Sequence, residues 1–448
     1  MLKTRNSSNF VCSQCGYSSV QWYGKCPSCG TWNSFQEFRV GKSKTQNAKR
    51  KTEEVKPVRL SEVKMVSSER ISSGIEEFDR VLGNGFVRGS IVLLAGEPGV
   101  GKSTLLLGLI KGMESAGKRN IFYVCGEESP EQVKLRAERV GITGENLLLL
   151  PETNVETIIE EVRSETEDKN TNPELLIIDS VQTLWSEDFE GEAGSVSQVK
   201  GCAQKLLEVA KNSGIPIVLV GHVTKEGVIA GPMILSHMVD VVLFLEGERF
   251  TELRLLRGFK NRFGPTDEVG VFKMTEKGME EVINPSELFL GRDKESKAAG
   301  ALVVCAMEGT RPVLLEIQAL VTQSALTIPR RVVSGVDYNR VMLLIAVLQK
   351  ILRLPLYNQD IYVKIGGGFK VLEPAADLDI ALAIISSFKN LPVPPKTCVF
   401  GEVGLLSEIK RVGNEEKRAK EAKKLGFTKI LSSLSVKNLQ EAITLIQN

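Results

Sequence analysis

The chain has 448 residues, of which 42% are hydrophobic and 25% are charged, and its formal net charge is +2. This length is too great for one hydrophobic core, so two or three domains are expected. No apolar run is long enough to span a bilayer, and the polar N-terminus lacks the apolar stretch of a signal peptide. We therefore expect a cytoplasmic protein with no membrane partner, not a secreted or membrane-spanning one.

Four of the eight cysteines form two C-x-x-C pairs that are ten residues apart. Four thiolates at this spacing suit tetrahedral Zn²⁺, and the metal would supply the folding energy of a segment with almost no core. A redox dithiol or disulfides are the alternatives, and a cytosolic setting disfavours disulfides. Residues 1–35 are therefore predicted to form a zinc finger. Its expected ligands are Cys12, Cys15, Cys26 and Cys29.

Aromatic and basic residues surround these cysteines. Trp22, Tyr23 and Trp32 lie in and beside the two pairs, where they either pack around the metal or stack on bases. Residues 1–59 hold eleven Lys and Arg against three Asp and Glu, a net charge of +8, so the remainder carries −6. This favours an anionic partner such as nucleic acid, although a solvated arm has the same composition. Residues 36–60 are predicted to be a basic linker.

A phosphate-binding loop follows in the next segment. Residues 96–103 match G-x-x-x-x-G-K-[ST] between an expected strand at 90–95 and an expected helix at 104–115. The glycines let backbone N–H groups surround phosphates, and the helix N-terminus adds positive dipole. Lys102 would reach the β- and γ-phosphates of ATP, and Ser103 would ligate Mg²⁺. The expected nucleotide-binding residues are Gly96, Glu97, Pro98, Gly99, Val100, Gly101, Lys102, Ser103, Thr104 and, further along the chain, Asp179.

Carboxylates end the strands that come next. The expected strand 121–125 leads into Glu127 and Glu128, one of which would orient and polarise the attacking water, with Glu127 favoured. Both could instead decorate the start of the following helix, which Ser129 and its capping box open. The apolar run 174–180 contains Asp179, which is expected to hold the Mg²⁺ water shell.

From residue 61 to 285, strand and helix patterns alternate, as in a parallel α/β domain. Further expected elements are a helix within 71–87, an exposed loop at 185–199, a helix at 201–212, a strand at 215–220 and a β pair at 239–245 and 253–256. His222 and His237 are the only histidines, and no metal site is expected for them. The cysteines outside the zinc finger lie in apolar surroundings and are expected to be buried.

The segment Lys260-Asn261-Arg262-Phe263-Gly264 is the most specific mark of a resemblance. Together with the four cysteines, GEPGVGKST, GEES and GHVTKEG, in this order, it resembles the bacterial RadA (Sms) family over essentially the whole chain. That family is RecA-like in its ATPase core and similar to Lon protease in its C-terminal domain. The resemblance thus implies an α/β fold: a RecA-like P-loop ATPase core with a small N-terminal zinc module and a C-terminal α+β Lon-like domain.

KNRFG is also similar to a cation pair of hexameric helicases that reaches the neighbouring subunit's γ-phosphate. This implies that Lys260 and Arg262 are trans-acting catalytic residues beside Lys102 and Glu127, in a ring that is expected to be a hexamer. RecA-like proteins bind single strands through two loops, which correspond here to 191–198 and 225–236. Lys200 and Lys225 are the expected phosphate contacts.

The C-terminal domain, residues 286–448, resembles the Lon proteolytic domain, which uses a serine–lysine dyad. Alanine occupies the serine position at Ala375, and an ungapped count from Gly401-Glu402-Val403 places Glu416 at the lysine position. Because peptide-bond attack then lacks its nucleophile, an inactive protease fold is expected, reused for ring assembly and DNA contact. The charged stretch 413–425 is expected to be a solvated helix face.

The sequence therefore predicts a DNA-stimulated ATPase of homologous recombination and DNA repair that uses ATP, Mg²⁺ and Zn²⁺. It would move along single-stranded DNA at branches and extend heteroduplex made by the RecA recombinase. An ATP-dependent protease is the disfavoured alternative, since it would need a serine at position 375. A RecA-fold regulatory switch or scaffold shares the core and is the third possibility.

Overall fold

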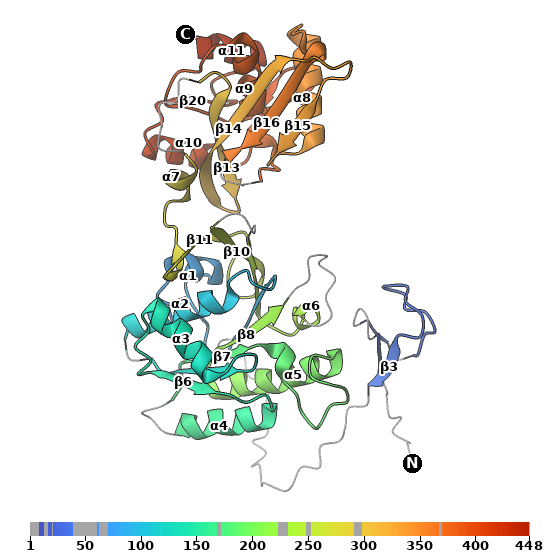
Figure 1. Ribbon diagram of the computed structural model, residues 1–448, viewed down its shortest axis with the longest axis vertical. Coiled ribbons are helices and arrows are strands. Elements are labelled where there is room, and N and C mark those ends of the chain that lie inside the picture. Colours follow the sequence, from blue (N-terminus) through green and yellow to red (C-terminus); the bar gives the residue numbers. More distant parts are fainter. Residues whose placement is uncertain are drawn as a thin grey trace. The chain divides into compact units, whose positions relative to one another are not determined.

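The structure is a computed structural model and describes residues 9–12, 17–19, 21–38, 61, 70–117, 119–167, 172–222, 232–247, 252–290, 298–366 and 370–447. The chain divides into two compact units, residues 1–281 and 282–448. Its parts are drawn together in Figure 1. The finer division into zinc finger, linker, ATPase and Lon-like domain stays a prediction.

The N-terminal residues form a small three-stranded antiparallel sheet, in the order β2-β1-β3. Its strands are β1 (Asn9–Cys12), β2 (Ser18–Ser19) and β3 (Phe35–Phe38). The buried hydrophobic cluster of this module comprises only Cys12, Cys26 and Phe35, with Phe10 packed against it. A core of this size cannot stabilise a fold alone, which agrees with a metal-dependent module.

A nine-stranded sheet forms the centre of the first unit, in the order β12-β11-β10-β9-β4-β8-β7-β5-β6. The strands from β9 to β6 run parallel, and β10, β11 and β12 extend the sheet as antiparallel strands. This arrangement confirms the α/β class. The strands, in chain order, are β4 (Ile91–Gly96), β5 (Ile121–Cys125), β6 (Leu147–Leu150), β7 (Leu175–Asp179), β8 (Ile217–His222), β9 (Val241–Glu246), β10 (Leu253–Asn261), β11 (Val269–Thr275) and β12 (Gly278–Glu281).

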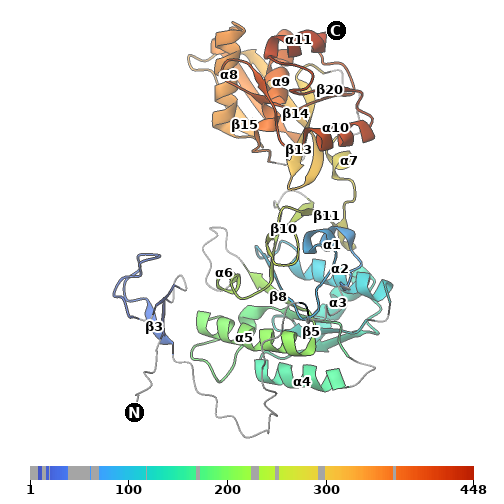
Figure 2. The same ribbon diagram turned by 180° about the vertical axis from the view of Figure 1, so that it is seen from behind.

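Helices cover both faces of this sheet, as the two views in Figures 1 and 2 show. Alternate residues of β4 point to opposite faces, so Val92 and Leu94 pack with α1, α2 and α3, whereas Ile91 and Leu93 pack with α4 and α5. Burial on both faces explains why the central strands are continuous apolar runs. The helices are α1 (Glu76–Leu82), α2 (Lys102–Ser115), α3 (Pro130–Val140), α4 (Val155–Glu167), α5 (Val196–Ser213) and α6 (Pro232–Leu235).

Most expected elements are present, and three differ from expectation. The helix within 71–87 is the short α1, because Gly74 has a φ of +75° and the preceding residues pair with Phe86 instead. Strand β10 continues to Asn261, so Lys260 lies inside it. Helix α5 begins at Val196, and the loop before it is not simply exposed, because the buried Gln198 amide donates to three of the loop's carbonyls.

The second unit contains a six-stranded sheet, in the order β15-β16-β14-β13-β17-β20, and a separate pair, β18 and β19. Its strands are β13 (Ala301–Glu308), β14 (Arg311–Gln323), β15 (Arg331–Ser334), β16 (Gln359–Ile365), β17 (Thr397–Val399), β18 (Glu402–Val403), β19 (Ile409–Lys410) and β20 (Lys429–Leu431). Its helices are α7 (Pro285–Phe289), α8 (Tyr338–Ile351), α9 (Asp377–Lys389), α10 (Glu415–Lys424) and α11 (Leu439–Gln447). Helix α9 is buried along almost its whole length, against β13 and β14.

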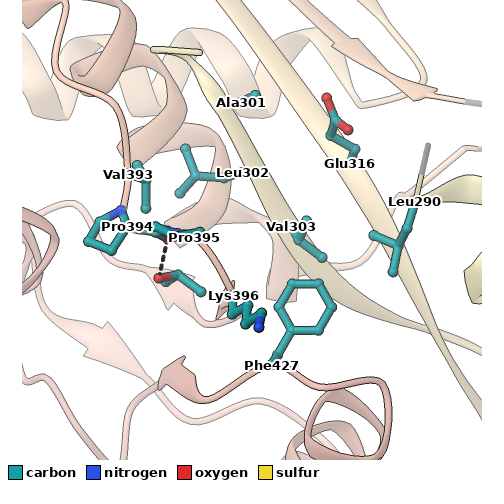
Figure 3. Close-up of a pocket in the computed structure, with 11 residues that line it drawn as sticks. Leu290, Ala301, Leu302, Val303, Glu316, Val393, Pro394, Pro395, Lys396 and Phe427 are labelled. Atoms are coloured by element: carbon teal, nitrogen blue, oxygen red, sulfur yellow. Dashed lines mark hydrogen bonds between the residues drawn. The ribbon is translucent and has the colours of Figure 1, made fainter. Parts of the chain in front are cut away.

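A pocket in this unit opens between the start of β13 and the loop before β17 (Figure 3). Apolar and proline side chains form most of its wall, with Glu316 and Lys396 as its charged members. Its volume of about 50 Å³ admits a few water molecules, far less than the roughly 300 Å³ at which ligand pockets begin. This pocket is therefore smaller than a typical ligand site.

The positions predicted to correspond to the protease dyad lie in a buried region that an ion pair holds together. Ala375 is 1% exposed in a short 3-10 helix, and its carbonyl accepts from the Gly401 N–H at 2.8 Å. Arg418, not Glu416, reaches this region from α10: its guanidinium donates to both carboxylate oxygens of Glu373, at 2.8 and 2.6 Å. The expectation that 413–425 is only a solvated face is thus wrong, because Arg418 is 1% exposed and Glu415 is 2% exposed.

Among the described residues, none of the helices combines the length and the apolar character that a bilayer crossing requires. The cysteines outside the zinc finger are buried as expected. Burial raises the pKa of the Cys125 thiol to about 11 and that of Cys202 and Cys305 to about 12. These thiols therefore stay protonated near neutral pH.

We predict that Arg418→Ala loosens the second unit. The change leaves the Glu373 carboxylate without both guanidinium donors, and removing one partner of a buried pair costs about 3–5 kcal/mol. Hydrogen exchange in peptides from β13, measured on the full chain, should become roughly a hundredfold faster or more. Lys417→Ala, on the exposed face of the same helix, is the control and should leave exchange unchanged. Equal exchange in the two variants would contradict this account of Arg418.

Candidate functional site

The loop between β4 and α2 has a backbone that only glycine fits at two positions. A Cβ on Gly96 would lie 2.6 Å from the carbonyl oxygen of Leu245 on the adjacent strand β9. Gly101, the residue before α2, has a φ of +110°, and a Cβ there would lie 2.6 Å from the Met274 side chain. The sequence motif therefore forms a tight turn that points the first N–H groups of α2 to one spot, which is a ready anion site.

Lys102 is the first residue of α2 and is 4% exposed. Its ammonium folds back over the loop and donates to the carbonyls of Gly96 and Glu97, at 3.0 and 3.1 Å. Burial lowers the pKa of Lys102, and the carboxylates of Asp179 and Glu127 oppose that shift. The lysine is thus a partly desolvated cation placed where phosphate groups would lie.

Three neighbouring parallel strands deliver further polar residues to the same edge of the sheet. Asp179 ends β7 opposite Cys125, the last residue of β5, and Glu127 follows β5 by two residues. His222 ends β8, which pairs with β4 so that His222 lies opposite Gly96. The carboxyl ends of parallel strands meet at one edge, where ligands of open α/β sheets bind.

His222 links the lysine to the glutamate. Its Nδ1 lies 3.0 Å from Lys102 Nζ, and its Nε2 lies 3.1 Å from the nearer carboxylate oxygen of Glu127. Because an ammonium only donates, Nδ1 must accept, and the proton must therefore be on Nε2, which donates to Glu127. The sequence reasoning missed this role, because the end of the buried strand before His222 could be predicted but its place beside the P-loop strand could not.

Glu127 and Glu128 have different surroundings. The hydrogen bond from His222 is the largest cause that lowers the pKa of Glu127, to about 2, and a further hydrogen bond from Ser180 adds to it against burial. Glu128 instead forms an ion pair with Arg136 on α3. Of the two carboxylates, Glu127 is the one connected to the P-loop lysine.

The residues expected to hold Mg²⁺ line one small cavity. Ser103 and Asp179 line it, together with Tyr123, Glu127 and Glu128. The Tyr123 hydroxyl donates to Asp179 at 2.6 Å, and burial beside this carboxylate raises the pKa of Tyr123 well above its usual value. Hydroxyl and carboxylate oxygens are the donors that Mg²⁺ prefers, so this set fits the ion.

Lys260 and Arg262 lie at the other edge of the sheet. Lys260 Nζ donates to the carbonyls of Ser236 and Val239, both at 2.7 Å, and these residues precede β9. Arg262 pairs with Asp240 at 3.1 Å, and the same carboxylate accepts from the N–H of Ile91 at the start of β4. Arg262 therefore lies near the start of β4, whereas the P-loop follows the end of the same strand. The two ends of β4 are about 16 Å apart, at 3.3 Å per residue.

Of the two expected DNA contacts, the structure describes Lys200 but not Lys225. Lys200 lies in α5, two residues after the buried Gln198, and its side chain is half-exposed. Gln198 is held inside the loop, so it is not free to contact a ligand. Lys225 lies outside the described residues, as does the rest of 223–231.

Three of the four expected zinc ligands come together in the N-terminal module. The sulfurs of Cys12, Cys26 and Cys29 all lie within 4.8 Å of one another, and the Cys12 and Cys29 sulfurs are 3.7 Å apart. Tetrahedral coordination with Zn–S bonds of about 2.3 Å requires sulfurs about 3.8 Å apart, so the cluster fits the metal. Cys15 lies outside the described residues.

Comparisons with known proteins agree with this geometry. Residues 56–228 match the family model described as an AAA domain, and residues 10–37 match the one described as a rubredoxin metal binding domain. The chain is 46% identical to the DNA repair protein RadA of Bacillus subtilis over 96% of this chain and 93% of that protein. It is 47% identical to the protein of the same name from Streptococcus pyogenes serotype M6, over 95% and 92%, and 46% identical to that of Listeria monocytogenes, over 96% and 93%.

We predict that the purified chain carries one zinc ion, which Cys26→Ser removes. The three clustered sulfurs leave one tetrahedral corner for a fourth ligand, and a module with so small a core loses its fold when the metal leaves. Metal analysis and limited proteolysis near the N-terminus should report the loss together. Cys125→Ala, a buried cysteine of the first unit's sheet, is the control and should keep its zinc. Full zinc retention by Cys26→Ser would contradict the site.

Proposed function

Because this chain belongs to the RadA family of DNA repair proteins, we propose that it is a DNA-stimulated ATPase that processes recombination intermediates. The observation that supports this most is the joint arrangement of Lys102, His222, Glu127 and Asp179 at one sheet edge. A phosphate loop, a cation and two carboxylates are the parts that nucleotide hydrolysis requires.

One half of the active site would come from the chain's own carboxyl edge. The Lys102 ammonium donates hydrogen bonds to two loop carbonyls and to His222. When ATP binds, it would donate to the β- and γ-phosphates instead. Ser103 and Asp179 would hold Mg²⁺, which neutralises phosphate charge when bound. Glu127 would orient the attacking water. Its low pKa makes it a weak base, so its task is to position and polarise this water more than to remove a proton.

His222 would keep Glu127 in place during this step. Its Nε2–H donates to the carboxylate, and its other ring nitrogen faces Lys102. When phosphates take the lysine's donors, the acceptor at Nδ1 loses its partner, and His222 can respond to the presence of ATP. We therefore assign His222 as a positioning residue.

The other half would come from a neighbouring subunit. Lys260 and Arg262 sit at the edge away from their own P-loop, so they are unsuited to act within one chain. In a ring, heterologous contacts place this edge of one subunit beside the nucleotide of the next, where two cations can stabilise the developing phosphate charge. A closed hexamer is the proposed assembly.

DNA would be the partner that hydrolysis acts on. We propose movement along single-stranded DNA at branches, extending heteroduplex that the RecA recombinase has made, in the cytoplasm. Lys200 and Lys225 are the proposed phosphate contacts. The second unit would serve ring assembly and DNA contact, since the position of a dyad serine holds the buried Ala375.

We predict that single-stranded DNA raises the ATP turnover of the wild-type chain, and that Glu127→Gln lowers turnover at least a hundredfold while nucleotide binding persists. The amide keeps the size of the side chain but removes the charge that polarises the water. Glu128→Gln is the matched control, because Glu128 pairs with Arg136, and it should keep most of the turnover.

The same preparations test the action on DNA. Wild type should extend a heteroduplex joint made by a recombinase in the presence of ATP, and Glu127→Gln should not. An ATP turnover rate that DNA does not change, together with no extension of the joint, would favour the regulatory switch or scaffold. Degradation of casein by the purified chain would favour the protease instead.

A further inference from the structure

Two tryptophans of the zinc module are exposed. Trp22 is 52% exposed and Trp32 is 68% exposed, in a module whose buried cluster uses neither. Tyr17 and Tyr23 are also exposed, at 41% each, but their rings pack on Phe35, with centroid distances of 6.3 and 5.8 Å. Of the three aromatics predicted either to pack around the metal or to stack on bases, Tyr23 packs within the module, whereas Trp22 and Trp32 lie outside its buried cluster. Exposing two such large rings costs solubility and needs a reason.

The two tryptophans form one surface. A Cβ built on Gly24 would lie 3.7 Å from the Trp22 ring and 3.9 Å from the Trp32 ring, so both ring edges border the same glycine. Lys25 pairs with Trp32 across an antiparallel bridge, and its ammonium lies 5.6 Å from the centre of the Trp32 ring. We name Trp22, Gly24, Lys25 and Trp32 the tryptophan patch.

The charge around the patch suits an anion. The first 36 residues contain Lys3, Arg5 and Lys25 but neither Asp nor Glu. The segment that follows, residues 37–59, holds eight Lys and Arg against three Glu, the first of which, Glu37, lies in β3. A zinc-thiolate centre would carry negative charge, and of its expected ligands Cys12 and Cys26 are buried and Cys29 is exposed. An anionic chain lying on the patch would meet the ammonium of Lys25.

We propose that the tryptophan patch is a stacking platform for the bases of single-stranded DNA. Flat, exposed rings stack on any base, and a neighbouring cation contacts the backbone phosphate, so binding needs no particular sequence. This tolerance suits a protein that acts wherever a break or branch occurs, and the inference rests on the proposed function. A protein partner would also use tryptophans, but its docking would not call for the excess of Lys and Arg over Glu in residues 1–59.

Tryptophan fluorescence tests the platform directly, because the chain has only three tryptophans. Trp185→Phe removes the one outside the zinc module and leaves the tryptophan patch as the sole indole emitter. Addition of oligo-deoxythymidylate to this full-length variant should quench its emission, with a midpoint that matches the DNA affinity. Binding of the oligonucleotide without quenching would overturn the proposal.

Substitutions give the second measurement. Trp22→Ala and Trp32→Ala should each weaken binding of oligo-deoxythymidylate about tenfold, the effect typical of losing one stacked base. Trp185→Phe should bind as wild type does, and zinc content confirms that the module is folded. Unchanged affinity in both alanine variants would overturn the platform and assign the patch to a protein partner.

The outcomes separate this inference from the proposed function. If DNA stimulates ATP turnover but neither quenches emission nor depends on the tryptophans, only the platform fails. If the oligonucleotide neither binds nor stimulates turnover, the DNA-dependent ATPase fails together with the platform.

Discussion

The common direction of the central strands is the constraint on which the site depends. Because β4, β5, β7 and β8 run parallel, their carboxyl ends gather Lys102, Glu127, Asp179 and His222 at one edge. The same constraint places the segments that precede β4 and β9 at the opposite edge. There the Asp240 carboxylate binds Arg262 and accepts from the N–H at the start of β4. The sheet thus separates the edge that carries the P-loop from the edge that carries Lys260 and Arg262, and the proposal that these cations act on a neighbouring subunit's nucleotide rests on this separation.

Hydrogen bonding at the phosphate-binding edge makes its charges interdependent. Lys102 is buried enough for its pKa to fall, yet two carboxylates nearby favour its charged form. His222 stands between this lysine and Glu127, and its proton lowers the pKa of the glutamate. A ligand that draws the Lys102 ammonium away therefore changes the hydrogen bonding of His222 and, through it, the electrostatic environment of Glu127. The chain of contacts provides a physical route by which nucleotide binding can affect Glu127, the residue that we propose orients the water.

Local signals predicted much of this architecture. The capping box at Ser129 is present with both of its hydrogen bonds, and the strand at 121–125 has the expected bounds. The P-loop strand and helix lie within two residues of expectation, because they are set by short-range periodicity and glycine geometry. What the sequence could not reveal depends on long-range contacts. The contacts of His222 depend on strand order, and the burial of Arg418 depends on Glu373, which lies 45 residues away in the chain.

Mixing two inactive variants tests the divided active site most directly. Lys102→Ala lacks the phosphate-binding half and Arg262→Ala lacks the cationic half, so each alone should hydrolyse little ATP. In rings of equal parts, about one quarter of the interfaces should combine an intact P-loop with an intact Arg262, and a corresponding fraction of turnover should return. Mixtures no more active than either variant alone, although mixed rings form, or an Arg262→Ala variant with normal turnover, would contradict a site shared between subunits.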